Sequence, residues 1–180
     1  MESQVDAALR DRDHDSASLL RRAAAGDRDA LASIVAGHDA DMARVAFVVC
    51  GDREVSRDAV QSSWLRAATR LGQVREPHRL RAWLCSVAAN EARQAMRGRR
   101  ATLPLTALDH HPAPGASTVE LMDLAAALGR LSVGDRELLA LRYVAGFRSD
   151  ELARHFRLTP AGIRTRTKRL LDRLRTELDR

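Results

Sequence analysis

Residues 148–174 read R-S-D-E-L-A-R-H-F-R-L-T-P-A-G-I-R-T-R-T-K-R-L-L-D-R-L, and this stretch decides the fold of the C-terminal half. Its apolar residues recur at helical spacing on both sides of a short interruption. Thr159 is a favourable N-cap, and Pro160 stands at the first helical position, where a missing N–H is tolerated. The stretch therefore predicts a short helix, a tight turn and a longer helix.

The longer helix has an apolar face and a basic face. Its inward stripe is Ile163, Leu170, Leu171 and Leu174. A short helix followed by a tight turn and a basic second helix is the usual geometry for entry into the major groove. A surface helix with merely solvated arginines is the alternative, but the cap, the turn and the charged face all favour the first interpretation. The predicted DNA-contacting residues are Arg164, Thr165, Arg166, Lys168 and Arg169.

The composition of the whole chain fits a helical protein with a polyanionic partner. The chain has 180 residues, 45% of them hydrophobic but only 3% aromatic, which favours helices over strands. Its formal net charge is +6, and its sequence pI is about 10.7. It has no signal peptide and no apolar run long enough to span a membrane, so we expect a cytoplasmic protein.

The chain divides into two helical regions with a connector between them. Residues 1–15 are polar and aperiodic, and we expect a mobile tail there. Helical periodicity covers residues 16–100 and resumes over residues 118–180. Between them, residues 101–117 contain L-P-L and H-H-P-A-P-G, which prevent a continuous helix. The predicted fold is therefore all-α, with two small helical domains joined by a flexible linker.

Two helices of the first domain carry most of its polar signals. One is expected over residues 54–71, with Trp64, Leu65 and Ala68 on its apolar side. The other is expected over residues 79–97, where Trp83 either fills the core or stacks on DNA bases, and its apolar neighbours favour the core. Between residues 75 and 100 there are seven Arg against two Glu, so this segment is strongly positive.

Catalytic and metal-binding residues are not evident in the sequence. No Ser/His/Asp set, Gly-rich phosphate loop or paired-carboxylate site is present, so neither an enzyme nor a cofactor is expected. Cys50 and Cys85 lie in apolar helical contexts and are interpreted as reduced core residues. His110 and His111 could bind a metal ion, but they lack further ligands at suitable spacing.

Several motifs together resemble those of bacterial extracytoplasmic-function (ECF) RNA polymerase sigma factors, the minimal type with regions two and four. The segment D-A-V-Q at residues 58–61, followed by W-L-R-A, is similar to the D-x-V-Q-x-x-F/W-L-R-A motif of that family. R-A-W-L at residues 81–84 with V-A-A-N at residues 87–90 is similar to R-A-W-L-x-x-I-A-x-N. The segment R-E-L-L-A-L-R-Y-V at residues 136–144 and I-R-T-R at residues 163–166 match motifs of region four.

The resemblance implies a role for each region. The first domain, residues 16–100, would be region two and the second, residues 118–180, would be region four. Asp58, Gln61 and Ser62 would face the clamp helices of the largest polymerase subunit. The basic helix of region four would dock in the minus-thirty-five element, and the linker would run toward the RNA exit path. Contacts to the minus-ten element would come from Arg79, Asn90, Arg93 and Arg97, with Asn90 near a pocket for a flipped base.

The expected function is therefore transcription initiation: the chain would bind core RNA polymerase, direct it to specific promoters and help to melt the minus-ten region. Expected partners are the polymerase core, promoter DNA and an anti-sigma factor. Two alternatives remain at this point. One is a stand-alone helix-turn-helix regulator that binds duplex DNA as a dimer. The other is a regulatory interaction protein that docks an anti-sigma-like partner.

Overall fold

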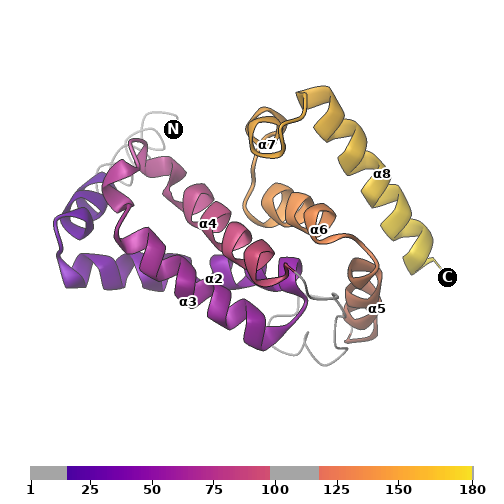
Figure 1. Ribbon diagram of the computed structural model, residues 1–180, viewed down its shortest axis with the longest axis horizontal. Coiled ribbons are helices and arrows are strands. Elements are labelled where there is room, and N and C mark those ends of the chain that lie inside the picture. The colour runs from indigo at the N-terminus through magenta and orange to yellow at the C-terminus, as the bar shows by residue number, and fades with distance from the viewer. Residues whose placement is uncertain (1–15, 98–117, 180) are drawn as a thin grey trace, which may run out of the picture.

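The structure is a computed structural model that describes residues 16–97 and 118–179, and these residues form helices and short turns (Figure 1). No β-strand occurs in those two ranges, and the all-α prediction is confirmed. The expected tail at residues 1–15 and linker at residues 101–117 lie outside the described residues. The helices are a short one at residues 16–24, then α2 (Arg28–Cys50), α3 (Arg53–Ala68), α4 (Leu80–Ala95), α5 (Thr118–Gly129), α6 (Val133–Leu139), α7 (Ser149–Phe156) and α8 (Pro160–Leu178).

Local capping residues set the helix boundaries in the N-terminal half. The Asp27 carboxylate accepts the backbone N–H groups of Asp29 and Ala30 at 3.0 and 3.1 Å, and this interaction starts α2. Gly51 ends α2 with φ 70°, a left-handed conformation that glycine adopts without a steric penalty. Asp52 then caps α3 by accepting the N–H of Val55 at 2.9 Å. Two 3₁₀ turns, Leu71–Gln73 and Pro77–Arg79, lead into α4.

The apolar faces of α2, α3 and α4 pack against one another and form the core of the N-terminal half (Figure 1). The prediction that Leu65 and Ala68 lie on the apolar side of α3 was wrong. Leu65 is 70% exposed, and Ala68 is also exposed. The buried residues of α3 lie on one stripe, and Leu65 falls outside it because α2 and α4 cover only that stripe. The core residues of the three helices include Ile34, Met42, Val45, Val49, Val55, Ala59, Val60, Leu80, Leu84 and Ala88.

The C-terminal half contains the expected helix-turn-helix. Ser132 caps α6 by accepting the N–H of Asp135 at 3.1 Å, and α6 continues into a π-helical segment, η4 (Ala140–Val144). The turn between α7 and α8 contains Arg157 at φ 54° and ψ 44°. The side chain of Thr159 then accepts the N–H of Gly162 at 3.0 Å at the start of α8. The predicted short helix, turn and long helix are all present.

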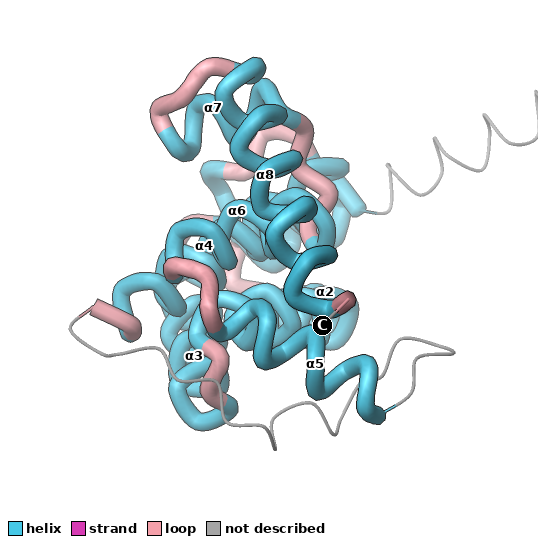
Figure 2. Tube along the Cα trace, turned by 90° about the vertical axis from the view of Figure 1, so that its right-hand side faces the viewer, coloured by secondary structure: helices cyan, strands magenta, loops and turns pink. Residues whose placement is uncertain are grey.

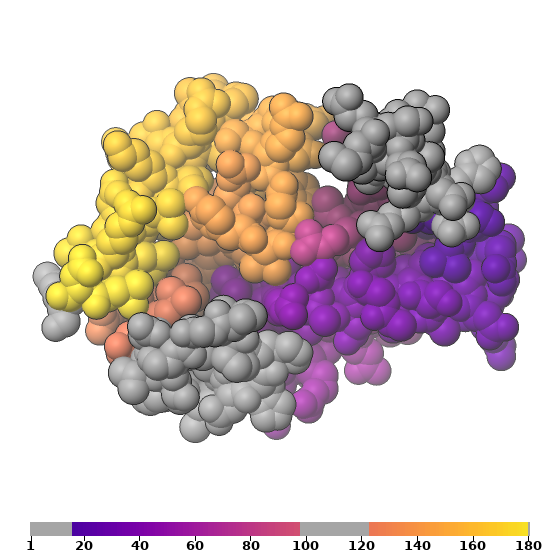
Figure 3. All heavy atoms as spheres, turned by 180° about the vertical axis from the view of Figure 1, so that it is seen from behind, coloured from indigo at the N-terminus to yellow at the C-terminus, as the bar shows by residue number. Residues whose placement is uncertain are grey.

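The two halves pack against each other. The α6 helix and η4 contact α2 and α4, and two perpendicular views show α6 next to both helices (Figures 1 and 2). Seen from behind, orange atoms of the C-terminal half lie against violet and magenta atoms of the N-terminal half (Figure 3). Leu138 and Leu141 are fully buried in one core shared with Met42 and Val45. The sequence did not predict whether the two domains pack together.

Candidate nucleic-acid interface

The outward face of α8 is the first part of the candidate interface. Ile163, Leu170 and Leu174 are buried against the rest of the C-terminal half, as the apolar spacing predicts. Leu171 is only half-buried. Among the described residues, only η4 approaches the edge of the opposite stripe, so its side chains remain accessible to a ligand. Four of the five predicted DNA-contacting residues are exposed there, namely Arg164, Thr165, Lys168 and Arg169.

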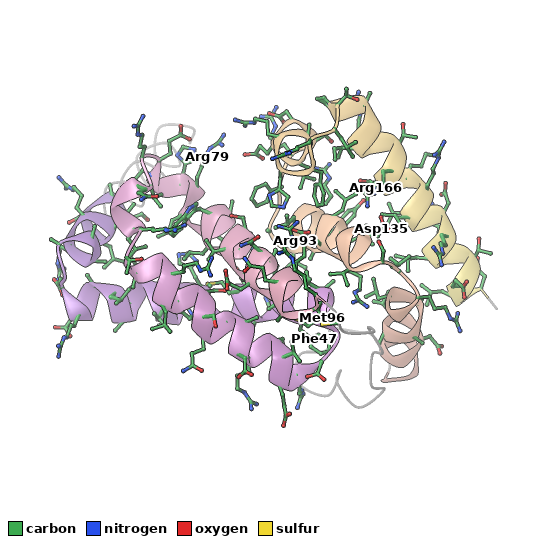
Figure 4. All side chains as sticks on the ribbon, viewed as in Figure 1. Phe47, Arg79, Arg93, Met96, Asp135 and Arg166 are labelled. Carbon is green, nitrogen blue, oxygen red and sulfur yellow. The ribbon has the colours of Figure 1, made fainter. Side chains whose placement is uncertain are left out.

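Arg166, the fifth predicted residue, has a different environment. Its Nη2 lies 2.7 Å from the Oδ1 of Asp135, and its Nε donates to the same oxygen at 2.9 Å (Figure 4). Its guanidinium carbon also lies 5.8 Å from the centre of the Phe156 ring, within range of a cation–π interaction. Arg166 is therefore half-buried and held on the side of α8 that faces α6. The local pattern could not show this because Asp135 is 31 residues earlier in the chain.

A cleft of about 240 Å³ runs between η4 and α8. Arg142 and Tyr143 line it from η4, while Arg164 and Lys168 line it from α8. Tyr143 is 57% exposed. The Thr167 hydroxyl also lines the cleft, and it is buried without a hydrogen-bond partner among the described residues. Arg175 also lines the cleft, where it pairs with the Asp172 carboxylate. The remaining three cations and the unpaired hydroxyl suit an oxyanion. The basic face of the predicted helix did not indicate Arg142 and Tyr143, although both belong to the L-R-Y segment of the quoted motif.

A second cleft of about 240 Å³ lies between α3, α4 and the end of α7. Arg66 lines it from α3 and Arg70 from the turn after α3, while Trp83 and Asn90 line it from α4. Glu91 also lines the cleft and pairs with Arg66 at 3.1 Å. Trp83 is half-buried against the core, as predicted, but it also borders this cleft. An aromatic ring, an amide and two guanidinium groups form a surface on which a base can stack and form hydrogen bonds. The sequence predicted Asn90 here but not Arg66 or Arg70.

The other predicted minus-ten residues are spread along α4 (Figure 4). Arg93 donates to the Oδ1 of Asn90 at 2.8 Å, so these two residues are adjacent. Arg79 lies at the opposite end of α4, and Arg97 is exposed just after the helix. Arg79 and Arg93 both reach carboxylates of the C-terminal half. Arg79 Nη1 lies 3.1 Å from Glu151, and Arg93 Nε lies 3.5 Å from Glu137.

A polar patch lies on the solvent-exposed side of α3. Asp58, Gln61 and Ser62 are all exposed, and the exposed Leu65 lies one helical turn beyond Gln61. The patch combines a carboxylate, an amide, a hydroxyl and an apolar side chain on one helix. This mixture is suited to a protein partner rather than to DNA phosphates, which require cations.

The cysteines and histidines add no further chemistry in the described residues. Cys50 and Cys85 are fully buried, and burial raises the pKa of Cys85 to about 11, so its reactive thiolate form is suppressed. No group of three or more His, Cys, Asp or Glu side chains that could hold a metal ion is found within residues 16–97 and 118–179. His110 and His111 lie outside the described residues. None of the described helices has the length and apolar character of a membrane span.

The fold and these sites define a two-part helical protein with a helix-turn-helix, of the kind that binds DNA. The Sigma-70 region 2 family matches residues 34–102, and the Sigma-70 region 4 family matches residues 121–174. Together the two matches cover more than half of the chain. The chain belongs to the ECF RNA polymerase sigma factor family.

Several known proteins are similar to this chain. A probable RNA polymerase sigma factor of Xanthomonas campestris, RfaY, is 32% identical over 88% of this chain, which spans only 43% of that relative. The sigma factor CnrH of Cupriavidus metallidurans is 27% identical over 89% of this chain and 93% of CnrH. The ECF sigma factor BldN of Streptomyces coelicolor is 29% identical over 90% of this chain and 67% of BldN.

Similarity extends to a solved structure. CnrH in complex with the cytosolic domain of CnrY matches this fold with a TM-score of 0.66 and 28% sequence identity. The match covers 89% of this chain and 95% of the CnrH chain. It therefore includes both helical halves.

Proposed function

We propose that this chain is a transcription initiation factor that binds core RNA polymerase, directs it to specific promoters and helps to melt the minus-ten region. The observation that carries the proposal is that two basic sites, each suited to nucleic acid, lie on separate helical halves of a sigma-family chain. The chemistry of RNA synthesis belongs to the polymerase, and this chain contributes recognition. Because its partners are polymerase and chromosomal DNA, its place of action is the cytoplasm.

The minus-thirty-five site is α8 with the adjoining cleft. Arg164, Thr165 and Arg169 project from α8 and would enter the major groove, where Arg contacts to guanine edges discriminate bases by about 1–3 kcal/mol. Lys168 with Arg142, across the cleft, would hold a backbone phosphate. The Thr167 hydroxyl would donate to that phosphate, which would satisfy its unpaired proton. Arg166 would reach DNA only by exchanging its partner Asp135 for a phosphate or a base.

The minus-ten site is the cleft beside Asn90. Extrusion of a base costs a few kcal/mol of stacking and pairing, and stacking on an aromatic ring recovers about 1–3 kcal/mol. Trp83 supplies the ring, and the Asn90 amide supplies both a donor and an acceptor for a base edge. Arg70 is suitably placed to neutralise a flanking phosphate, and Arg66 would do so by exchanging its partner Glu91 for the phosphate. Arg79, Arg93 and Arg97 would extend this phosphate contact along α4.

The polymerase contact is the α3 patch of Asp58, Gln61, Ser62 and Leu65, which would bind the clamp helices of the largest polymerase subunit. Leu65 offers an apolar anchor in a polar surround, the usual composition of a reversible protein interface. We also propose that an anti-sigma factor regulates the chain. This proposal is supported by the similarity to CnrH, which was solved in complex with the cytosolic domain of CnrY.

Separate variants test the division of labour between the two halves. Changing Asp58 and Gln61 to Ala should weaken retention on core polymerase by about tenfold or more, because the patch loses its charged and amide contacts. Arg166→Ala should lower initiation at a minus-thirty-five-dependent promoter by about tenfold while core retention is unchanged. Promoters would be found by sequencing transcripts from a genomic library copied by core enzyme plus this protein. If the unmodified chain is not retained on core, the proposed function is wrong.

A further inference from the structure

Arg166 differs from the other predicted DNA-contacting residues of α8 in the side of the helix that it occupies. It stands three positions after Ile163 and four before Leu170, and both of those residues are buried. Residues at these spacings are neighbours on a helix surface, and the Arg166 side chain points toward α6 (Figure 4). Arg164 and Lys168, by contrast, are exposed and form no ion pair within the described residues. Arg166 therefore has a partner inside the protein, whereas its neighbours are available to DNA.

The partner of Arg166, Asp135, is held at the start of α6. Its Oδ2 accepts the Ser132 hydroxyl at 2.7 Å, and the Ser132 oxygen accepts the backbone N–H of Asp135 at 3.1 Å. Asp135 also lies in the first turn of α6, where the helix dipole favours a carboxylate. The carboxylate is thus oriented independently of Arg166, with its Oδ1 directed to α8.

Two contacts fix the Arg166 guanidinium. Its Nε and Nη2 lie 2.9 and 2.7 Å from the Oδ1 of Asp135, and its central carbon lies 5.8 Å from the centre of the Phe156 ring on α7. The side chains of Arg166 and Asp135 are 37% and 20% exposed, so solvent screens this pair less than a pair on the open surface. One side chain of α8 thus joins this helix to both α6 and α7.

Exchange of Asp135 for DNA would be unfavourable. Arg166 would lose both of its bonds to the carboxylate, and Asp135 would remain as an unpaired anion next to the phosphates. Like charges brought together across an interface oppose binding. Arg164, on the exposed stripe, meets DNA without such a loss. These terms favour a pair that persists when DNA binds.

We propose that Asp135 is a positioning residue for DNA recognition: it retains Arg166 when DNA binds, and the pair sets the direction in which α8 enters the major groove. The inference rests on the proposed function, because it takes α8 to be the minus-thirty-five helix. Direct base contacts then belong to Arg164, Thr165 and Arg169. Such contacts need side chains placed within about 0.5 Å, so a helix that tilts loses them, while phosphate contacts from flexible cations largely survive.

The test compares two promoter duplexes in the complex of this chain with core polymerase. One carries the minus-thirty-five element of a promoter found by transcript sequencing, and the other has that element scrambled. The ratio of the two affinities measures minus-thirty-five recognition. Asp135→Ala should lower this ratio by about tenfold, because α8 loses its anchor to α6. If Asp135 only competes with DNA for Arg166, the same substitution would release the cation, the ratio would stay unchanged or rise, and the inference would be wrong.

A double variant tests whether Arg166 has a DNA contact of its own. Asp135→Ala with Arg166→Ala should be no weaker than either single variant, because residues that act as one unit are not additive. The double variant keeps the net charge and should keep the slope of log affinity against log salt, because the pair releases no counterion from DNA. A further loss of about tenfold, or a slope reduced by about one as expected for Lys168→Ala, would show that Arg166 contacts DNA and would overturn the inference.

Matched variants separate positioning from a general loss of charge or fold. Asp135→Glu keeps an acceptor for Arg166 and should restore the ratio to within about twofold of the unmodified chain. Asp29→Ala removes an exposed carboxylate from α2 and should leave the ratio unchanged. Circular dichroism verifies folding. If the Ala variant unfolds, Asp135→Asn, which has nearly the same volume and a weaker acceptor, should lower the ratio by roughly threefold, and an unchanged ratio would contradict the inference.

Retention on core polymerase distinguishes failure of this inference from failure of the proposed function. The unmodified chain and all of these variants should be retained equally, because the α3 patch is intact in each. Retention and promoter selection by the unmodified chain, with no change of the ratio in Asp135→Ala, would overturn positioning alone. Absence of retention of the unmodified chain would overturn the proposed function.

Discussion

At the scale of single residues, Arg81 joins the two helical halves. It bonds Asp41 in its own half and two carbonyl groups of η4 in the other half. The Arg81 guanidinium, which donates to Asp41, holds the pKa of that carboxyl below its ordinary value of 3.8. This pair therefore contributes to stability and also fixes the guanidinium that joins the halves.

The depressed pKa of Asp41 gives a pH dependence of known sign. A carboxyl whose pKa is lower in the folded state contributes stability above its unfolded value and loses it as the pH falls through the folded value. Asp41→Asn should therefore lower the free energy of unfolding by about 1 kcal/mol near neutrality. In urea titrations followed by circular dichroism, this difference should shrink as the pH falls below 3.8. A stability difference that persists undiminished in strong acid would contradict this assignment. The control is Arg28→Gln, at an exposed position at the other end of α2.

At the scale of elements, the turn between α7 and α8 contains a non-glycine residue in a strained backbone conformation. Arg157 has φ 54°, in the left-handed region that favours glycine. The left-handed conformation costs a non-glycine residue about 1–2 kcal/mol. The turn therefore stores strain that a single substitution can relieve.

Arg157→Gly should raise the free energy of unfolding by about 0.5–1 kcal/mol, because relief of strain exceeds the extra unfolded-state entropy of glycine. Thermal unfolding followed by circular dichroism would measure the change as a higher Tm. The matched control is Arg154→Gly, an exposed position inside α7, which should cost about 1 kcal/mol. Destabilisation by both substitutions to a similar extent would show that Arg157 makes a favourable contact that outweighs its strained backbone.

At the scale of the whole molecule, the distribution of charge matters more than its total. The net charge is +6, but several arginines are paired within the chain, whereas Arg164 and Lys168 flank the open cleft on α8. Sequence-independent DNA binding depends on the cations that reach phosphates and release counterions. The surface of α8 should therefore dominate nonspecific binding by the free chain.

Lys168→Ala should weaken binding to mixed-sequence duplex DNA and reduce the slope of log affinity against log salt by about one. Fluorescence anisotropy over a range of salt concentrations would measure both. Arg28→Ala removes the same charge from an exposed site on α2 and should leave the slope unchanged. Equal slopes for the two variants would show that net charge, rather than the α8 surface, governs the binding.

The sequence by itself determined the helices, their caps and the helix-turn-helix, because these depend on residues within a few positions of one another. Asp27, Ser132 and Thr159 all cap the helices that follow them. Helical periodicity also placed Ile163, Leu170 and Leu174 on the buried face of α8. These features follow from local backbone hydrogen bonding and from the 3.6-residue repeat.

Only the tertiary structure decided which side chains meet across the fold. The pair between Arg166 and Asp135, the cleft between Arg142 and Lys168, and the outward position of Leu65 each depend on how helices lie against one another. The packing of α4 against α6 and α7, which places Glu137 and Glu151 on Arg93 and Arg79, joins residues 44 and 72 positions apart. Such contacts are set by the shape and charge of whole surfaces, and no local pattern of residues encodes them.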